Sequence, residues 1–301
     1  MANPRFDGSG VALVTPFRDG SVNDAVLAEL VRFHHDEGTD ALIVCGSTGE
    51  AAAMSPKEQL QAVTTVVEAN AGRLPVIVGC GGTDTRAVAQ LGRQARDAGA
   101  DAVLLSAPPY NKPPQRGLTD HFRTVMDAAD LPAIIYNVPG RAAVNILPAT
   151  IAGLADDERV IGVKEACGDI VQIAELARVV GDRLAIWSGN DDQVVPVMSL
   201  GGRGVISVMA NVVPALTRRM THAWLDGDTT HAADLQLRLL PLVRALFAES
   251  NPIPVKAAVG WLGFDVGDLR APLCAPDPEL QKVVIRELEA VGIRPQVRAT
   301  S

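Results

Sequence analysis

Short apolar runs recur along the first two thirds of the chain, and polar, helix-forming stretches separate them. The runs are rich in Val, Ile, Leu and Ala, and they are continuous instead of alternating with polar residues. That pattern is typical of strands that are buried on both faces. It predicts strands at residues 11–15, 41–45, 76–79, 102–106, 133–136, 160–164, 184–188 and 204–208.

Helix signals occupy the gaps between these runs. The sequence Ser55-Pro56-Lys57-Glu58 combines an N-cap residue, a proline at the first helical position and a glutamate that can complete a capping box. A helix is also expected over residues 25–37, where Gly38 follows as a stop signal. Further helix starts are expected at short polar side chains that can cap: Asn23 or Asp24, Thr83 or Asp84, Asp169, Asn190 and Asn211.

The alternation of strands and helices predicts an α/β fold. It fits a parallel sheet closed into a (β/α)8 barrel, the TIM barrel. An open, doubly wound sheet is the alternative, but residues 16–20 lack the glycine-rich fingerprint that usually follows its first strand. Strand signals stop at about residue 226, after which the pattern predicts helices broken at Pro252, Pro254 and Pro276. We therefore expect a catalytic barrel domain at residues 1–225 and a helical C-terminal region at residues 226–301.

Composition and charge exclude several classes of function. With 48% hydrophobic residues, 21% charged residues and a net charge of −8, the 301-residue chain has a globular composition. It has no basic cluster for nucleic acid and no apolar stretch long enough for a membrane. The first residues lack a signal-peptide core, and the cysteines are far apart, so a cytoplasmic location without disulfides is expected. The histidines are isolated or adjacent, and no metal centre is expected.

Lys164 is the most informative residue, because it ends the apolar run at residues 160–163. Burial favours the neutral amine, which is a nucleophile for ketones and aldehydes. A lysine at a strand end can also simply extend its ammonium group into water. Of the five lysines in the chain, Lys164 alone is expected at an inner strand end.

Other residues with useful chemistry follow the predicted strands. The only two tyrosines, Tyr110 and Tyr136, both do so, and a phenol can relay protons during Schiff-base formation. Ser47 and Thr48 can offer hydroxyl and backbone N–H groups to a small carboxylate, and Arg141 can bind a carboxylate bidentately. Each also has an ordinary explanation: a core tyrosine, a helix cap or a surface ion pair. Asp191 and Asp192 are expected to cap a helix after the strand at residues 184–188.

Four motifs resemble the signatures of the pyruvate-dependent class I aldolases, the dihydrodipicolinate synthase / N-acetylneuraminate lyase superfamily. They are Gly-Ser-Thr-Gly-Glu at 46–50, Tyr-Asn-Lys-Pro at 110–113, Tyr-Asn-Val-Pro-Gly-Arg at 136–141 and Gly-Val-Lys-Glu at 162–165. The match runs in order from Thr15 to residues 251–256 and so covers most of the chain. The resemblance implies the barrel and helical region inferred above, and a homo-oligomer built as a dimer of dimers.

The resemblance also implies a role for each candidate residue. Lys164 would form the Schiff base with pyruvate. Tyr136 would shuttle protons in a relay with Ser47 and with Tyr110 of the partner subunit. The remaining roles concern substrate binding: Thr48 with Ser47 for the pyruvate carboxylate, Arg141 for the carboxylate of aspartate semialdehyde, Ile206 through its backbone carbonyl beside the lysine, and Gly189 at the end of the seventh strand.

Within the superfamily, the stretch Pro139-Gly140-Arg141 is similar to that of the synthases, since sialic acid lyases lack this arginine. Ser47 is more similar to the lyases and sugar-acid aldolases, because many synthases have threonine there. Both side chains supply a hydroxyl, so Arg141 decides between the two classes. The resemblance therefore implies a lyase that condenses pyruvate with aspartate semialdehyde in lysine and diaminopimelate biosynthesis. No metal or organic cofactor is expected, because the covalent amine is the electron sink. The alternatives are a pyruvate-dependent aldolase or lyase for keto-deoxy sugar acids or N-acetylneuraminate, and a non-catalytic binding barrel.

Feedback control by free lysine is expected to be weak or absent. The resemblance places the regulatory lysine of inhibited relatives near the tyrosine pair at a dimer interface. Ala87 stands where such relatives carry a glutamate, and Pro109 where they carry a second tyrosine. The other matching positions are Ala51, Pro56, Gln59 and Thr83. An ammonium group that leaves water without a charged partner is costly, so little affinity is expected here.

Overall fold

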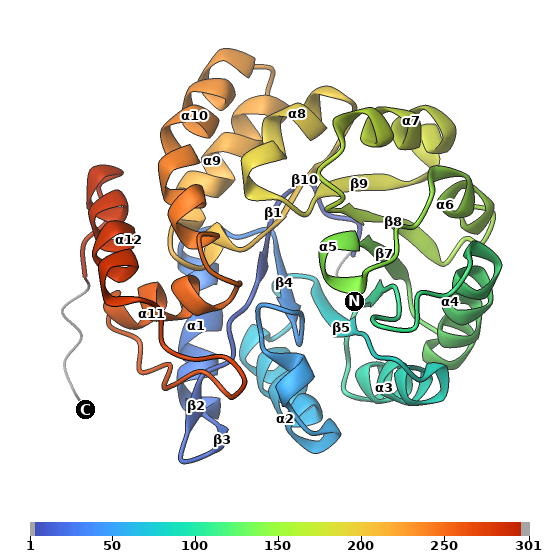
Figure 1. Cartoon of the computed structure of the whole chain (residues 1–301), viewed down its shortest axis with the longest axis horizontal. Coiled ribbons are helices and arrows are strands. Elements are labelled where there is room, and N and C mark those ends of the chain that lie inside the picture. The colour runs from blue at the N-terminus through green and yellow to red at the C-terminus, as the bar shows by residue number, and fades with distance from the viewer. Residues whose placement is uncertain (1–3, 296–301) are drawn as a thin grey trace.

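The computed structural model describes residues 4–295, and its centre is a closed barrel of parallel strands surrounded by helices (Figure 1). The predicted (β/α)8 fold is therefore confirmed. Around the barrel the strand order is β1-β10-β9-β8-β7-β6-β5-β4. The bounds of the barrel strands are β1 (Gly8–Ala12), β4 (Ala41–Val44), β5 (Val76–Cys80), β6 (Ala102–Ser106), β7 (Ala133–Asn137), β8 (Val160–Glu165), β9 (Ala185–Ser188) and β10 (Gly204–Ser207).

The first strand lies three residues earlier than the apolar pattern predicts. β1 begins at Gly8 because two glycines, which have little strand propensity of their own, are needed for close packing there. A Cβ atom on Gly10 would lie 2.7 Å from the ring of Phe6 and 2.9 Å from Ile43. A short hairpin of β2 (Phe17–Arg18) and β3 (Ser21–Val22), which the pattern does not predict, follows the strand.

An outer ring of helices covers the strands (Figure 1). The side chains of Asn23, Ser55, Asp84 and Asp169 cap helices as predicted, and Ser55 and Glu58 complete the expected capping box. The ring consists of α1 (Asp24–Asp36), α2 (Pro56–Asn70), α3 (Thr85–Asp97), α4 (Gln115–Ala129), α6 (Pro148–Leu154), α7 (Ile170–Val180), α8 (Val194–Ser199) and α9 (Pro214–Leu225). The four-residue helix α5 (Pro139–Ala142) lies inside this ring in the view, beside β7 and β8 (Figure 1). Short 3-10 turns lie between them: η1 (Ala51–Ala53), η2 (Gly181–Arg183), η3 (Asp191–Gln193) and η4 (Met209–Asn211).

Two expected helix starts differ in detail from the structure. Asn190 does precede a helical turn, as the N-cap residue of η3, but its side chain makes no capping hydrogen bond. Asn211 lies in η4, while α9 begins at Pro214. The amide of Asn211 instead accepts from Val14 N at 3.1 Å and donates to Ala12 O at 2.7 Å, so it bonds to the backbone at and just after the end of β1.

The C-terminal region is helical, as predicted, with α10 (Thr229–Leu246), α11 (Ile253–Trp261) and α12 (Pro278–Ala290). Pro252 and Pro254 lie at the start of α11 and so do not interrupt it, because proline is tolerated in a first helical turn. These helices lie on one side of the barrel, beside α1 and α9 (Figure 1). Their apolar faces share one cluster of buried residues with α1, α8 and α9.

The barrel interior is filled by side chains from alternate strand positions. Phe6 closes the end from which the strands start: its ring stacks on Trp187 at 4.9 Å between centroids, and its carbonyl accepts from the indole N–H at 3.1 Å. Tyr136 and Ile206 belong to the same interior cluster. Catalytic side chains are therefore expected at the opposite end of the barrel, where the strands finish.

Within residues 4–295, no helix combines the length and apolar content needed to cross a membrane. The same part of the chain contains no group of His, Cys, Asp and Glu side chains arranged to hold a metal ion. Cys45, Cys80, Cys167 and Cys274 are free thiols, and the first two are buried as expected for small core residues.

Candidate active site

Lys164 and Tyr136 face each other on neighbouring strands at the carboxyl end of the barrel. They are register partners in the β7–β8 pair, so their side chains project from the same side of the sheet. The Lys164 Nζ lies 4.4 Å from the centroid of the Tyr136 ring. Both side chains are buried, with exposures of 5% and 9%. The structure thus brings together the two residues to which the sequence assigns the central chemistry.

Burial changes the acid–base properties of both groups. It lowers the pKa of the Lys164 ammonium to about 8. The negative charge of Asp191 has the smaller, opposite effect, because it favours the charged form of the lysine. Burial also raises the pKa of the Tyr136 phenol to about 12. Arg141 lowers the pKa of both groups through its positive charge. Near neutral pH, Lys164 therefore reaches its nucleophilic neutral form easily, and Tyr136 keeps a proton that it can donate.

Glycines make room for the lysine. A Cβ atom on Gly189 would lie 3.1 Å from Lys164 Cε and 2.7 Å from Ala166 Cβ. The absent side chain thus leaves space immediately beside the amine-bearing chain, where Gly189 is expected to contact substrate. Below it, a Cβ atom on Gly162 would lie 2.4 Å from the ring of Trp187, so this glycine admits the tryptophan into the barrel interior.

Asp191 is not the helix cap that the sequence suggests. It is buried, and its Oδ2 accepts hydrogen bonds from Val208 N at 3.1 Å and Met209 N at 2.8 Å. These bonds attach the turn after β10 to the end of β9. Burial raises the pKa of the carboxyl group, and the side chain of Ser207 and the backbone of residues 208 and 209 oppose that shift. Asp191 is thus a buried acid that both shapes this end of the barrel and acts electrostatically on Lys164.

The loop that follows β4 carries Ser47 and Thr48 in two successive tight turns. Gly49 N donates to Gly46 O at 3.1 Å, and Glu50 N donates to Ser47 O at 3.2 Å. Cys45 and Glu50, which flank the turns, adopt left-handed backbone conformations with φ of 56° and 57°. Such conformations cost about 1–3 kcal/mol for residues other than glycine and are concentrated at functional sites. Ser47 is exposed, whereas Thr48 is buried.

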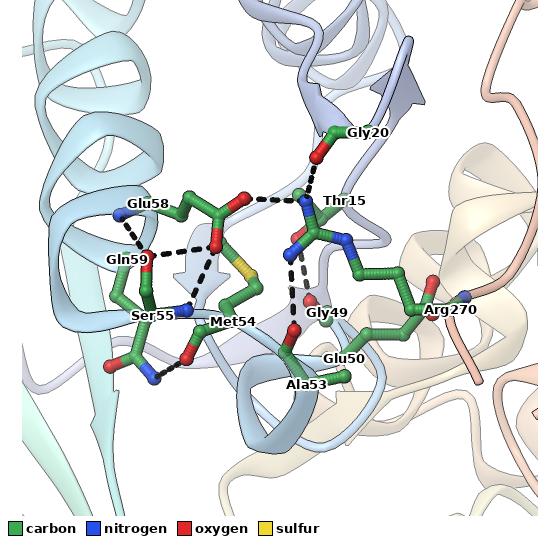
Figure 2. A network of polar contacts seen from close by, with 10 residues as sticks. All are labelled: Thr15, Gly20, Gly49, Glu50, Ala53, Met54, Ser55, Glu58, Gln59 and Arg270. Atoms are coloured by element: carbon green, nitrogen blue, oxygen red, sulfur yellow. Dashed lines mark hydrogen bonds and ion pairs between the residues drawn. The ribbon is translucent and has the colours of Figure 1, made fainter. Parts of the chain in front are cut away.

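A polar network fastens this loop to the C-terminal region (Figure 2). Glu50 is buried, and one of its carboxylate oxygens accepts from Lys256 Nζ at 2.7 Å while the other accepts from Arg270 N at 2.8 Å. The Arg270 guanidinium also binds Ala53 O, Gly20 O and the carboxylate of Glu58 (Figure 2). The hydrogen bond from Arg270 to the Glu58 carboxylate lowers the pKa of Glu58 to about 2.

Lys256 is a residue whose importance the sequence analysis missed. It lies inside the otherwise apolar α11 and is almost completely buried, and burial lowers its pKa against the pull of Glu50. The sequence does contain a signal for this role, a single lysine within an apolar helix, because a buried ammonium group needs a charged or hydrogen-bonding partner. The position of Lys256 shows that the residues after 226 reach the loop after β4.

Arg141 lies on the short helix α5, with an exposed side chain. Its NH2 group donates to Asn251 O at 2.8 Å, which ties α5 to the segment before α11. The amide of Asn251 in turn donates to Thr48 Oγ1 at 3.0 Å. The two carboxylate-binding candidates, Thr48 and Arg141, are therefore joined through one residue that the sequence analysis did not single out.

Behind the lysine, Glu165 and Asn137 hold the strand ends together. Asn137 Nδ2 donates to both oxygens of the buried Glu165 carboxylate at 3.0 and 3.2 Å, and Cys167 N donates to one of them at 2.8 Å. Burial raises the pKa of Glu165. These contacts span β7 and β8, so they stabilise the backbone positions from which Tyr136 and Lys164 project.

Two further candidates differ sharply in their surroundings. Ile206 on β10 is completely buried and packs inside the barrel in the cluster that contains Tyr136. Tyr110, on the loop after β6, is 88% exposed and has a left-handed backbone with φ of 68°. The ring of Tyr110 is therefore not packed into the core of its own chain.

A model of the dihydrodipicolinate synthetase family matches residues 5–291. The chain therefore belongs to the dihydrodipicolinate synthetase family. The 4-hydroxy-tetrahydrodipicolinate synthase of Thermoanaerobacter sp. strain X514 is 54% identical over 271 residues, which cover 90% of this chain and 91% of that protein. The dihydrodipicolinate synthase structure from Aquifex aeolicus has a TM-score of 0.94 at 39% identity and covers 97% of this chain and 100% of its own.

A third family member is the chloride-inhibited dihydrodipicolinate synthase from Acinetobacter baumannii, crystallised in complex with pyruvate. It has a TM-score of 0.92 at 36% identity and covers 96% of this chain and 99% of its own. These relatives confirm the expected function, that of a 4-hydroxy-tetrahydrodipicolinate synthase, and the chain is an enzyme of the lyase class. They favour neither another pyruvate-dependent aldolase nor a non-catalytic binding barrel.

Proposed function

We propose that the chain joins pyruvate to aspartate semialdehyde through a Schiff base on Lys164. The observation that carries this proposal is the buried Lys164 amine, with a pKa of about 8, against the ring of Tyr136 at 4.4 Å. In the first step the neutral amine adds to the ketone carbon of pyruvate to give a carbinolamine. Loss of water then gives the imine, and the departing hydroxyl group needs a proton, which Tyr136 is suited to supply.

The imine then acts as the electron sink for bond formation. Loss of a methyl proton converts it to an enamine, whose carbon attacks the aldehyde of the semialdehyde. The amino group of the second substrate next attacks the imine carbon, closes the ring and expels Lys164 as the free amine. Protons move between the substrates, Lys164, Tyr136 and water, and no step is a net oxidation or reduction, so we propose that no metal or organic cofactor is involved.

Two carboxylate-binding positions accompany the lysine in this proposal. Ser47 and Thr48 bind the carboxylate of pyruvate, with Gly189 and the backbone of Ile206 beside the imine. Arg141 binds the carboxylate of the semialdehyde, for which a guanidinium group is well shaped. Support comes from the lowering of the Lys164 and Tyr136 pKa values by Arg141, which requires its charge to act across the site. Support also comes from the contact of Asn251 with both Thr48 and Arg141.

The working enzyme in this proposal is a cytoplasmic homo-oligomer, a dimer of dimers. The exposed Tyr110 supports it, because an aromatic side chain held at 88% exposure on a strained loop is well suited to enter the site of a partner subunit. We also propose that residues 1–225 carry the catalytic groups, and that residues 226–301 support them through Asn251, Lys256 and Arg270.

Borohydride trapping tests the chemistry directly. Pyruvate with borohydride is expected to label Lys164 irreversibly, as located by peptide mass mapping. Lys256 is the matched internal control, because it is the other buried lysine and its amine is engaged by Glu50. Lys164→Ala and Lys164→Arg should both abolish labelling while folding normally, since a guanidinium group stays protonated. Labelling at Lys256, or at no lysine, would contradict the mechanism.

A further inference from the structure

Asn251 occupies a bridging position between the two carboxylate-binding candidates. It lies between α10 and α11 and is 6% exposed. Its side-chain Nδ2 donates to Thr48 Oγ1 at 3.0 Å, and its backbone carbonyl accepts from Arg141 NH2 at 2.8 Å. The side chain and the main chain of one residue thus contact two different functional groups.

The bond to Thr48 determines what the threonine hydroxyl can do. A hydroxyl group has one hydrogen to donate and can accept in other directions. Because Thr48 Oγ1 accepts from Asn251, its own hydrogen is free to point elsewhere. An ionised carboxylate only accepts hydrogen bonds, so a hydroxyl arranged as a donor is the form that binds it.

The other end of the Asn251 amide argues against a purely structural role. Its Oδ1 is buried without a hydrogen-bond partner, which is unfavourable for stability. Asn211, also buried, shows the contrast, because its amide uses both ends: Nδ2 donates to Ala12 O and Oδ1 accepts from Val14 N. An asparagine selected for packing alone would be expected to satisfy both ends, as Asn211 does.

We propose that Asn251 is a positioning residue that fixes the Thr48 hydroxyl as a hydrogen-bond donor to the pyruvate carboxylate. This inference rests on the proposed function, since it takes Thr48 as part of the pyruvate site. It adds a residue from the C-terminal region that acts on the first substrate through Thr48. The Asn251 side chain affects pyruvate binding through Thr48, whereas the Asn251 backbone carbonyl binds Arg141. A substitution of the side chain leaves that backbone carbonyl in place.

The test separates the two substrates. The pyruvate concentration that half-saturates borohydride trapping reports the first substrate alone, and steady-state assays give the Michaelis constant for the semialdehyde. Asn251→Ala is expected to raise the half-saturating pyruvate concentration by roughly five- to tenfold, the value of one hydrogen bond. Asn251→Asp should raise it further, because a carboxylate accepts the Thr48 hydrogen and repels pyruvate. The Michaelis constant for the semialdehyde should change by less than about twofold in both variants.

A double-mutant cycle establishes whether the effect passes through Thr48. In a Thr48→Val background, Asn251→Ala should add less than about twofold, whereas in Thr48→Ser its full effect should persist. An undiminished effect in Thr48→Val, or equal losses for both substrates, would overturn the inference. If Asn251→Ala does not fold, Asn251→Ser serves instead, because its shorter side chain cannot reach Thr48 as the amide does.

The same data distinguish failure of this inference from failure of the proposed function. A Thr48→Val variant with unchanged pyruvate saturation would contradict the assignment of Thr48 itself. A Thr48→Val variant that loses pyruvate affinity, together with an Asn251→Ala variant that does not, would contradict only the role of Asn251.

Discussion

Lys164 is held in surroundings that oppose its charge. A lysine side chain prefers to be protonated and hydrated, but here its amine lies against the ring of Tyr136, and its chain passes beside Gly189 at the neighbouring strand end. Burial therefore lowers its pKa from 10.5 to about 8. The lowered pKa makes the amine nucleophilic near neutral pH, and the same shift means that the folded state loses stability at this position.

That conflict predicts a variant that is more stable and inactive. The folded pKa lies below the unfolded one, so between about pH 8 and 10.5 the unfolded chain binds more protons and stability rises with pH. Below pH 8 the full penalty applies, on the order of 3 kcal/mol. Lys164→Met, which keeps the shape and removes the charge, should raise the free energy of unfolding at pH 7 by up to that amount.

Chemical denaturation at several pH values measures this effect. The wild-type protein should gain stability relative to Lys164→Met as the pH rises from 8 to 10.5, and the variant should form no imine. A variant less stable than the wild-type protein at pH 7 would show that the ammonium group is compensated and not strained.

For single residues, the sequence predicts a functional role where the residue type is unusual at its position. It does not predict a role that depends on contacts with residues distant in the chain. Lys164 stands out because an apolar strand rarely ends in lysine, and Tyr136 because tyrosines are rare in this chain. Asn251 and Asp191 have no such signal. Their roles depend on contacts with Thr48 and with the turn after β10, which are distant in sequence.

The loop after β4 shows what an element requires beyond its own sequence. Its two left-handed residues, Cys45 and Glu50, are unfavourable locally and persist because surrounding contacts hold them. Gly79 on β5 leaves room for the loop, since a Cβ atom there would lie 2.4 Å from Cys45 O. The buried pair of Glu50 and Lys256 then attaches the loop to α11.

Loss of either member of that pair should destabilise the fold, and the two losses should not add. Lys256→Met leaves the Glu50 carboxylate buried without its cation, and a loss of about 3–5 kcal/mol in the free energy of unfolding is expected. Glu50→Gln leaves the ammonium group without its anion and should also destabilise. The double variant should lose clearly less than the sum of the two single variants, as measured by denaturant unfolding. Strictly additive losses would mean that the two residues act independently.

Secondary structure is predicted well where local signals and tertiary packing agree. The capping box of α2 and the buried strands are examples, because the same residues that favour the element locally also pack it. The start of β1 is missed because its glycines are required by close packing, of Gly8 against Asp40 and of Gly10 against Phe6, and not by strand propensity. The cap expected at Asn211 is missed because its amide bonds to the backbone of residues 12 and 14, which pattern alone does not reveal.

On the scale of the whole molecule, the exposed Tyr110 predicts that activity depends on assembly. Tyr110→Phe should leave the oligomer intact and reduce turnover by on the order of 10²-fold, because the phenol would be lost from the proton relay. Sedimentation of the variant controls for assembly, and a stopped-flow or coupled assay gives turnover. A monomeric form with full activity, or a fully active Tyr110→Phe, would show that the site is complete within one chain.

Free lysine is expected to inhibit weakly or not at all. Ala87 and Pro109 lack the charge and the phenol that would accept its ammonium groups. Gln59 is already engaged, since its amide donates to Ala51 O at 2.9 Å. Condensation measured with lysine raised into the millimolar range checks this, and saturable inhibition there would reveal a lysine site of different composition.

The contacts between the loop after β4 and the C-terminal region also affect the order in which the protein can fold during synthesis. Thr48 is bonded to a residue 203 positions later, and Glu50 to residues 206 and 220 positions later. At about 5–20 residues per second, a ribosome needs roughly 10–40 s to cover the longest of these separations. All eight barrel strands are synthesised before Asn251, Lys256 and Arg270, the residues that hold the loop after β4. A nascent chain therefore acquires its catalytic competence last, when residue 270 is available to close the network.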